Sequence, residues 1–427
     1  MIDINLLRDE KTRNLVIESE KKRFKDPNIV TKASELDRLR ITQRYNQEQL
    51  SKEINQLQNE IKLLYKSNKK EEAQILVNKS KNLKDKRDEL DNEIEKSEKE
   101  LKYLLKQIGN ILHQDVVVSK NEEENKLIAS YRTKRIIYGN LGYDQILEKI
   151  GGCDTARGSR LAGHRGYYLM GETALLANAL SRYAIDFLRE KGFKLVQPPV
   201  FMNKDAMTKT CQLSEFDEQL YAVENDLYLI ATSEQPLSAL HMNERLLPSQ
   251  LPLLYSGQSL CFRKEAGAHG KDNAGIFRVH QFEKIEQFVI CDKESSQMWF
   301  EKMIRYCQEF YESLDISYNV VSIVSGEMND AASIKYDLEA FFPNTNRFRE
   351  LVSCSNCTDF QSRSLEVRYG VGKEDDKKVY VHMLNCTMCA IQRTLCCILE
   401  NYQKEDRVVI PRPLRKYFDG EFIIFKE

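Results

Sequence analysis

Two runs of mostly apolar residues, spaced at alternating steps of four and three, constrain the fold of this chain more than any other sequence feature. The spacing averages 3.5 residues, which places these side chains in one stripe along a helix, as in the seam of a coiled coil. Glu and Lys fill the other helix faces. The first run comprises Leu50, Ile54, Leu57, Ile61 and Leu64, and the second comprises Leu76, Ser80, Leu83, Arg87, Leu90, Ile94, Ser97, Leu101, Leu104 and Ile108.

A short polar segment, residues 66–70, separates the two runs. Two helices of similar length joined by such a turn are typical of an antiparallel hairpin. The alternative is a parallel coiled coil that holds two chains together. That arrangement requires one unbroken register, and the turn argues against it. The sequence therefore predicts a helical hairpin.

Composition changes near residue 115. Before this point Gly occurs only at Gly109 and Pro only at Pro27, and charged residues dominate. Residues 116–170 are charged and then punctuated by glycine, which is typical of a connector. After residue 170 helical and strand patterns alternate. We therefore expect three regions: a helical domain with a long coiled-coil arm over 1–115, a connector over 116–170, and a mixed domain over 171–427.

Charge and composition restrict the function classes. Lys and Arg number 64 against 65 Asp and Glu, a net charge of −1, so a globally basic nucleic-acid coat is excluded and nucleic-acid binding requires a local patch. No stretch approaches the roughly 20 apolar residues of a membrane span, and the start lacks the apolar run of a signal peptide. The 11 cysteines, an odd number, indicate a reducing compartment. We expect a cytoplasmic protein without a membrane partner.

The region after residue 170 has the pattern of an α+β domain. Residues 171–190 have helical spacing, Gly192 fits a helix stop, and residues 193–196 fit a short strand. Residues 258–264 and 276–291 read as strands flanking a polar, glycine-rich loop; without a helix between them they favour an antiparallel pair. The predicted apolar stripe of the helix comprises Leu175, Leu176, Leu180, Tyr183, Ala184, Phe187 and Leu188.

Charged side chains line both predicted strands. Because side chains alternate between the faces of a strand, we expect Arg263 and Glu265 on one face and Lys264 on the other. A face with guanidinium, carboxylate and aromatic groups suits a charged planar ligand, since arginine clamps phosphate bidentately. The alternative is an exposed face held by salt bridges, and periodicity alone does not decide between them. The return strand carries the ladder Arg278, His280, Phe282, Lys284 and Glu286.

This segment, FRKEAG followed by GIFRVHQFEKIEQF, resembles the second signature motif of class II aminoacyl-tRNA synthetases in the form found in seryl-tRNA synthetases. Residues 232–234 (TSE) look like the serine-pocket triplet of that family, residues 348–356 (FRELVSCSN) like its metal and ATP segment, and residues 384–403 like its third motif. The helix from Gly171 to Pro198-Pro199 is similar to the first motif, a dimer-interface element. The resemblance, which includes the hairpin, implies a class II catalytic domain over 171–427, with an antiparallel sheet flanked by helices.

The resemblance implies an ATP site. Arg263 would hold the α-phosphate, Phe282 would stack on adenine, and Arg393 would clamp the far end of ATP, so Arg263 and Arg393 are the implied catalytic residues. Glu350 and Ser353 would position Mg²⁺ on the phosphates. The implied ATP-binding set is Arg263, Lys264, Glu265, Val279, His280, Gln281, Phe282, Glu350, Leu351, Val352, Ser353 and Arg393.

The resemblance also implies a polar pocket for serine. A small hydroxylated substrate needs polar partners, because rejection of alanine depends on leaving a buried group unpaired. No covalent nucleophile is needed, since adenylate formation is a displacement at the α-phosphorus that positioning and electrostatics can carry. The implied serine-binding set is Thr232, Ser233, Glu234, Arg263, Glu286, Asn385 and Thr387.

The implied activity is activation of L-serine with ATP to seryl-adenylate and pyrophosphate, then transfer of serine to the 3′ end of tRNA(Ser), and of tRNA(Sec). The implied enzyme is a homodimer whose arm grips the long variable arm of the tRNA. A basic tip on the hairpin would supply the local patch that a chain of this net charge requires. This tip comprises Lys62, Lys66, Lys69, Lys70, Lys79, Lys81, Lys84 and Arg87.

Three other functions compete with this interpretation. A repurposed paralogue could keep the fold and bind a nucleic acid or protein, but it would have no use for Arg263, Glu286, Glu350 and Arg393 together. A different class II synthetase is disfavoured by the TSE triplet and the arm. A structural coiled-coil protein would leave the second half of the chain unexplained.

Two CxxC pairs, Cys354/Cys357 and Cys386/Cys389, form a pattern that normally indicates zinc. The pairs are farther apart than in ordinary zinc ribbons, and both lie within segments whose neighbours would bind ATP and serine. We therefore expect buried free thiols and no zinc. Elsewhere the chain departs from many bacterial relatives, which carry Thr-Arg where residues 272–275 read DNAG.

Overall fold

The computed structural model describes residues 1–211, 219–265, 275–370 and 378–426. The chain forms two compact units: Met1–Lys21 with Lys25–Gly109, and Lys22–Phe24 with Asn110–Glu427. The predicted glycine-rich loop and its DNAG departure lie outside the described residues, apart from Gly275.

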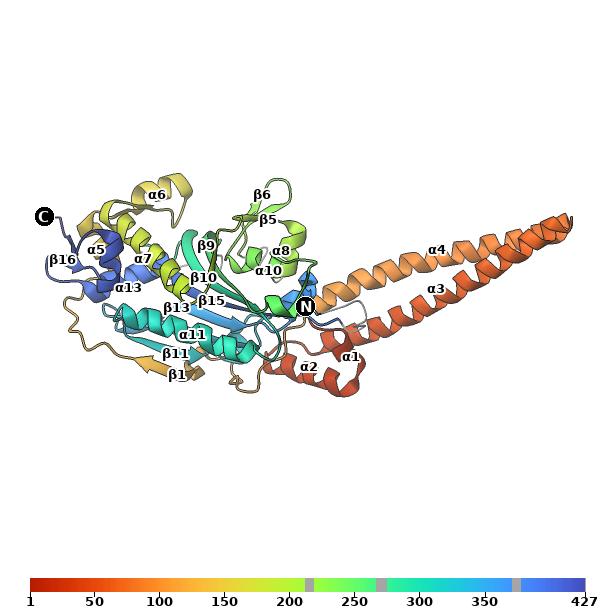
Figure 1. Ribbon diagram of the computed structural model, residues 1–427, viewed down its shortest axis with the longest axis horizontal. Helices are drawn as coiled ribbons and strands as arrows, with labels where there is room; N and C mark the ends of the chain where they lie inside the picture. Colours follow the sequence, from red (N-terminus) through yellow and green to blue (C-terminus); the bar gives the residue numbers. More distant parts are fainter. Residues whose placement is uncertain (212–218, 266–274, 371–377, 427) are drawn as a thin grey trace. The chain divides into compact units, whose positions relative to one another are not determined.

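The first unit contains the predicted helical hairpin. Its two long helices run side by side (Figure 1), and at 1.5 Å per residue each is about 58 Å long. Ile54 and Leu57 of one helix and Ile94 and Leu101 of the other are buried, as the spacing predicts. The hairpin is thereby confirmed. The helices are α1 (Asn5–Arg8), α2 (Glu10–Lys22), α3 (Asn28–Lys66) and α4 (Lys70–Gln107).

A buried carboxylate ties α3 to α1. Asp37 is 1% exposed and accepts hydrogen bonds from Arg8 Nε at 2.7 Å and from Arg40 Nη2 at 2.8 Å. Burial opposes ionisation of Asp37, but the hydrogen bonds and charges of the two arginines prevail and hold its pKa below the ordinary value. This ion network therefore stabilises the start of the hairpin only while Asp37 is charged.

The second unit is built on a sheet of eight strands, counted over the described residues. Neighbouring strands run antiparallel, except that β4 pairs with β9 in parallel, so the α+β class is confirmed. In spatial order the strands are β1 (Lys126–Tyr131), β11 (Tyr318–Ser322), β12 (Ile334–Phe342), β13 (Arg347–Asn356), β15 (His382–Ala390), β10 (Gln281–Cys291), β9 (Leu253–Phe262) and β4 (Lys194–Val196).

Helices pack on this sheet (Figure 1) and enclose the main core, to which Phe300 of α11 and Leu180 of α7 contribute buried side chains. They are α5 (Tyr143–Ile150), α7 (Gly171–Glu190), α11 (Ser296–Ser313) and α13 (Ile391–Tyr402). Further helices are α6 (Thr155–Ala162), α8 (Lys204–Thr210), α10 (Glu234–Ala239), α12 (Phe360–Leu365) and α14 (Arg415–Phe418). Three small sheets have two strands each: β2 (Cys153–Asp154) with β3 (Tyr168–Leu169), β14 (Arg368–Tyr369) with β8 (Arg245–Leu246), and β16 (Arg407–Val409) with β17 (Phe422–Ile424). In a further small sheet, β7 (Leu227–Leu229) lies between β5 (Phe201–Asn203) and β6 (Ala222–Val223). No helix in the described ranges is long and apolar enough to cross a membrane.

Two residues that flank the hairpin in the sequence belong to the second unit and hold one of its loops. Arg23 donates from Nη1 to the carbonyl of Asn329 at 3.2 Å and from Nη2 to that of Ala332 at 2.6 Å. Asn110 donates from Nδ2 to the carbonyl of Ala331 at 2.9 Å. Arg23 also donates to the carbonyl of Asn110 itself. These contacts fix the loop that precedes β12.

The structure corrects three details of the sequence prediction. β9 begins at Leu253 and ends at Phe262, rather than spanning 258–264. The return strand begins at Gln281, not at residue 276. Ile276 and Val279 are buried in the core without being part of a strand, so their apolar character reflects burial rather than strand pairing. Leu175, predicted on the apolar stripe of α7, is 51% exposed.

Candidate active site

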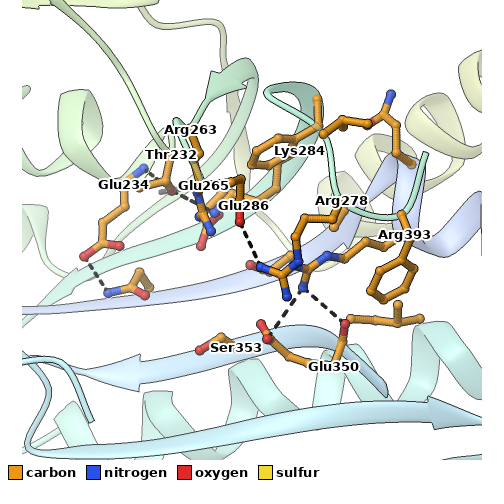
Figure 2. A pocket seen from close by; sticks show the side chains of 18 of the residues that line it. Thr232, Glu234, Arg263, Glu265, Arg278, Lys284, Glu286, Glu350, Ser353 and Arg393 are labelled. Atoms are coloured by element: carbon orange, nitrogen blue, oxygen red, sulfur yellow. Dashed lines mark hydrogen bonds and ion pairs between the residues drawn. The ribbon is translucent and has the colours of Figure 1, made fainter. Parts of the chain in front are cut away.

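A cavity of about 300 Å³ lies on one face of the sheet of the second unit. Lys284 and Glu286 of β10 face it, whereas Gln287 points the other way and donates a hydrogen bond to Met303 of α11. Figure 2 shows acidic and basic side chains converging there. The cavity is lined by Thr232, Glu234, Arg263, Glu265, Phe277, Arg278, Val279, Phe282, Lys284, Glu286, Asn329, Lys335, Glu350, Leu351, Ser353, Ser355, Asn385, Thr387, Ala390, Gln392 and Arg393.

A β-bulge brings Glu350 and Ser353 to the same cavity. An odd step along a regular strand would place them on opposite faces. However, Ser353 lies opposite Asp337 and Glu350 opposite Glu339, with the register shifting between Leu338 and Glu339 of β12. β13 therefore carries an extra residue at the shift, and such a bulge re-aims the side chains on either side of it.

A second bulge has the same effect in β15. Glu286 lies opposite Thr387, whereas the preceding Ile285 lies opposite Cys389, so Met388 is the extra residue. Thr387 and Ala390 consequently both line the cavity despite the odd step between them. Two bulged strands thus provide the cavity with side chains that alternation alone would divide between the two faces.

Cationic and aromatic groups gather where nucleotide binding was predicted. The guanidinium carbon of Arg263 lies 5.3 Å from the centre of the Phe282 ring, and Arg263 Nε donates to the carbonyl of Ala231 at 3.2 Å. Arg278 Nη1 lies 2.8 Å from Glu265 Oε2. Guanidinium groups held in this way can contact phosphate oxygens, and the Phe282 ring can stack on a planar base.

Glu350 and Arg393 form an ion pair, with Nη1 3.5 Å from Oε2. Desolvation opposes ionisation of Glu350, but Arg393 and then Lys335 hold its pKa below the ordinary value. An ionised carboxylate beside the hydroxyl of Ser353 fits Mg²⁺, which prefers oxygen ligands and is commonly held by one or two carboxylates together with substrate phosphates. Within the described residues no group of three or more His, Cys, Asp or Glu could hold a metal ion by itself.

The predicted serine-pocket residues form a connected polar group. Glu234 Oε1 accepts from Asn385 Nδ2 at 2.9 Å and from Gln361 Nε2 at 2.7 Å. Thr232 Oγ1 lies 3.5 Å from Glu286 Oε2. Gln361 is 2% exposed and is not a lining residue, and no sequence motif pointed to its role in holding Glu234.

Five predicted site residues do not line the cavity: Ser233, Lys264, His280, Gln281 and Val352. Ser233 is fully buried and faces Gly257, where an added Cβ would lie 2.6 Å from its hydroxyl oxygen. His280 uses Nδ1 in a 2.8 Å hydrogen bond with the carbonyl of Arg263, so it is a framework residue. Val352 is buried in the core. Arg263 and Glu265 do line the cavity and Lys264 does not, but β9 ends at Phe262, so this division does not come from the alternation of a strand.

Several lining residues were absent from the predicted site: Phe277, Arg278, Lys284, Asn329, Lys335, Ser355, Ala390 and Gln392. Of these, Lys284 lies on β10 as the predicted ladder has it, whereas Arg278 precedes the strand, which begins at Gln281. Lys335 comes from β12, which no motif marked, and its ammonium lies 3.8 Å from Asp337 Oδ2. Burial raises the pKa of Asp337 to about 7 although Lys335 opposes this.

The four cysteines of the CxxC pairs are buried free thiols. Cys354 and Cys386 lie opposite each other on β13 and β15, while Cys386 Sγ is 3.5 Å from Cys307 Sγ. Burial raises the pKa of Cys389 to about 12 and raises that of Cys357, so these groups remain thiols at neutral pH.

Comparison with known proteins agrees with this geometry. Residues 1–112 match the model of the seryl-tRNA synthetase N-terminal domain, and residues 215–402 match that of the tRNA synthetase class II core domain (G, H, P, S and T). A serine–tRNA ligase of Encephalitozoon cuniculi is 58% identical over 426 residues, 99% of each chain. The solved seryl-tRNA synthetase of Pyrococcus horikoshii, complexed with ATP, is 39% identical, with a TM-score of 0.92 over 100% of both chains.

The solved cytoplasmic serine-tRNA ligase of Naegleria fowleri, in complex with AMP, is 40% identical, with a TM-score of 0.89 over 100% of this chain and 99% of that chain. Identity at this level, along the whole length and over both units, covers the arm and the cavity alike. The chain belongs to the seryl-tRNA synthetase family.

Proposed function

We propose that the chain is a serine–tRNA ligase, which activates L-serine with ATP to form seryl-adenylate and pyrophosphate and then transfers serine to the 3′ end of tRNA(Ser). One observation carries the proposal: a single cavity holds both sets of groups that the first step requires. Thr232, Glu234 and Glu286 are polar partners for a small hydroxylated amino acid, and Arg263 and Arg393 are cations for phosphate groups.

Activation is a displacement at the α-phosphorus by the carboxylate of serine. In our proposal Arg263 holds the α-phosphate and stabilises the charge that develops there, and Phe282 stacks on adenine. Arg393 holds the far end of ATP. Fixed charges of this kind act without reorganising during the reaction, and this is the source of their effect on rate. Glu350 and Ser353 would hold Mg²⁺, which when bound neutralises charge on the phosphate oxygens.

Serine selection rests on buried polar groups. Glu286 is 1% exposed and Thr387 is 7% exposed, so a ligand without a hydroxyl would leave buried acceptors or donors unpaired. An unpaired buried group discriminates far more strongly than the size of one small side chain. We therefore assign rejection of alanine to Glu286 and Thr387.

Binding of tRNA is assigned to the hairpin. Lys62, Lys66, Lys69 and Lys70 near its turn are exposed and can release counterions from phosphates of the long variable arm. The proposed domain limits remain 1–115, 116–170 and 171–427. Because the Naegleria relative is named as cytoplasmic, we also assign this chain to the cytoplasm.

A homodimer is proposed on the basis of exposed apolar side chains near the first motif. Leu175 of α7, Leu195 of β4 and Phe201 of β5 are 51%, 43% and 52% exposed. Large apolar side chains that the chain leaves exposed suit contact with a second copy. Light scattering coupled to size exclusion tests this assignment, and a purely monomeric species would contradict it.

ATP–pyrophosphate exchange, measured with each amino acid in turn, tests the main proposal. Serine should support exchange far above threonine, alanine or cysteine. Equal stimulation of exchange by alanine and serine would contradict the proposed serine pocket. Absence of exchange with every amino acid would favour the rival interpretation, a repurposed paralogue that binds nucleic acid or protein.

A further inference from the structure

Lys284 is a buried cation inside the proposed serine pocket. Lys284 is 6% exposed and Glu286 is 1% exposed. The ammonium of Lys284 contacts Oε2 of Glu286. Lysine is strongly hydrated and is seldom buried without a charged partner. A Lys–Glu pair at this depth therefore needs an explanation, and its place on the cavity wall suggests that it serves the ligand.

The ammonium of Lys284 also fixes the neighbouring threonine. Nζ donates to Thr232 Oγ1 at 2.8 Å, and the backbone N–H of Glu234 donates to the same oxygen at 3.2 Å. A hydroxyl group has two acceptor lone pairs and one donor. Both acceptor positions of Thr232 are thus occupied, and its hydroxyl donates to Glu286 Oε2 at 3.5 Å.

Lys284, Glu286 and Thr232 lie together in the cavity wall. Lys284 and Glu286 are two residues apart on a regular strand and so face the same side, and Thr232 lies against both. Lys284 and Thr232 both contact Glu286 at Oε2, so among the described residues Oε1 is the oxygen left for a hydroxyl donor of the ligand. The result is a site with one carboxyl acceptor, one oxygen of which is held by both Lys284 and Thr232.

We propose that Lys284 is a positioning residue for serine selection. It holds the carboxyl group of Glu286 in place as the acceptor for the hydroxyl of serine, and by donating to Thr232 Oγ1 it directs the Thr232 hydroxyl to the same carboxyl group. This inference rests on the proposed function and adds to it a residue that acts through Glu286 and Thr232 rather than on the phosphates.

A double-mutant cycle in pyrophosphate exchange tests the inference, using the full chain with Lys284→Met, Glu286→Gln and both together. Lys284→Met should raise the KM for serine at least tenfold while the KM for ATP stays within twofold. Because Lys284 acts through Glu286, adding Lys284→Met to Glu286→Gln should raise the serine KM by less than threefold. Lys191→Met is the matched control, since Lys191 pairs with Glu309 outside the cavity.

The outcomes separate the possible failures. Equal changes in the KM for serine and ATP, or multiplication of the two single effects in the double variant, would overturn the role of Lys284. If thermal denaturation shows that Lys284→Met does not fold, the comparison of Glu286→Gln with the double variant decides. The serine KM of the double variant should then lie within threefold of that of Glu286→Gln. If Glu286→Gln leaves both the serine KM and the preference over alanine unchanged, the serine pocket itself is misplaced and the proposed function fails at this site.

Discussion

Arg393 Nη1 lies 3.5 Å from Glu350 Oε2, so the cation assigned to the far end of ATP and the carboxylate assigned to Mg²⁺ are ion-pair partners. Glu350 keeps 48% of its side chain exposed, which leaves the pair open to exchange with a ligand. When ATP and Mg²⁺ bind, Arg393 would pair with the phosphates and Glu350 would pair with Mg²⁺, in place of their pairing with each other.

The two arginines of the proposed ATP site should be the most sensitive positions for activation. Arg263→Ala and Arg393→Ala should each lower serine-dependent exchange by roughly 10²–10³-fold, because each removes a fixed electrostatic donor. Lys264→Ala should have a much smaller effect, since its side chain does not line the cavity. Equal loss in Lys264→Ala and Arg263→Ala would contradict the assignment of Arg263 alone of the two to the cavity.

Glu350→Gln should weaken the binding of Mg²⁺ rather than the recognition of serine. The concentration of Mg²⁺ that gives half-maximal exchange should rise about tenfold or more, because an amide is a weaker ligand for Mg²⁺ than a carboxylate. The serine KM at saturating Mg²⁺ should change little. Direct binding of Mn²⁺ in the presence of ATP, followed by electron paramagnetic resonance, gives a readout independent of turnover.

Asp37 should make the stability of the first unit depend on pH. Its pKa is lowered on folding, so its contribution is fully present above the ordinary pKa of about 3.9 and is lost as the pH falls through the folded value. Asp37→Asn should cost about 1–3 kcal/mol near pH 7. This difference should begin to shrink below about pH 4, where Asp37 of the unfolded chain becomes neutral, and should vanish only below the lower pKa of the folded state. Denaturant unfolding of both proteins at pH 7 and pH 3 measures the difference; a constant gap would contradict the role of the ion network.

The arm should be dispensable for activation and required for charging. Replacing residues 31–108 with a short bridge should abolish serylation of tRNA while serine-dependent pyrophosphate exchange largely survives. In the full chain, changing Lys66, Lys69 or Lys70 to Ala should lower the salt slope of tRNA binding by roughly 0.7–0.9 for each phosphate that is no longer neutralised. Normal tRNA affinity in the shortened protein would mean that the hairpin is only structural.

Local periodicity was sufficient to predict the elements whose burial repeats along one helix. The hairpin follows from the seam that includes Ile54 and Ile94 together with a polar turn, since both signals lie in the sequence itself. The antiparallel pairing of β9 with β10 likewise needed only their adjacency. The ends of these strands could not be predicted from the sequence. Ile276 and Val279 are apolar because they are buried, and a paired strand would have the same apolar composition.

The cavity depends on relationships between distant strands. Glu350 shares a cavity with Ser353 only because β13 carries an extra residue opposite β12, and no local pattern marks that position. Lys335 and Gln361 reach the site through pairing and packing that only the folded chain defines. The roles implied by resemblance remain predictions at each residue, whereas the convergence of most of them on one cavity is a property of the structure.

Arg23 and Asn110 hydrogen-bond to the same loop of the second unit, and the hairpin lies between them in the sequence. The hairpin is therefore inserted into the chain of the second unit. Chain length can therefore be added or removed only in matched amounts on α3 and α4, since an unmatched change would shift one helix of the coil past the other. Natural or engineered variation in arm length should accordingly occur as paired heptads. An arm exchanged between relatives should be cut beyond Arg40 on α3 and at the matching level of α4, so that the loop before β12 and the contact of Asp37 with Arg8 both keep their supports.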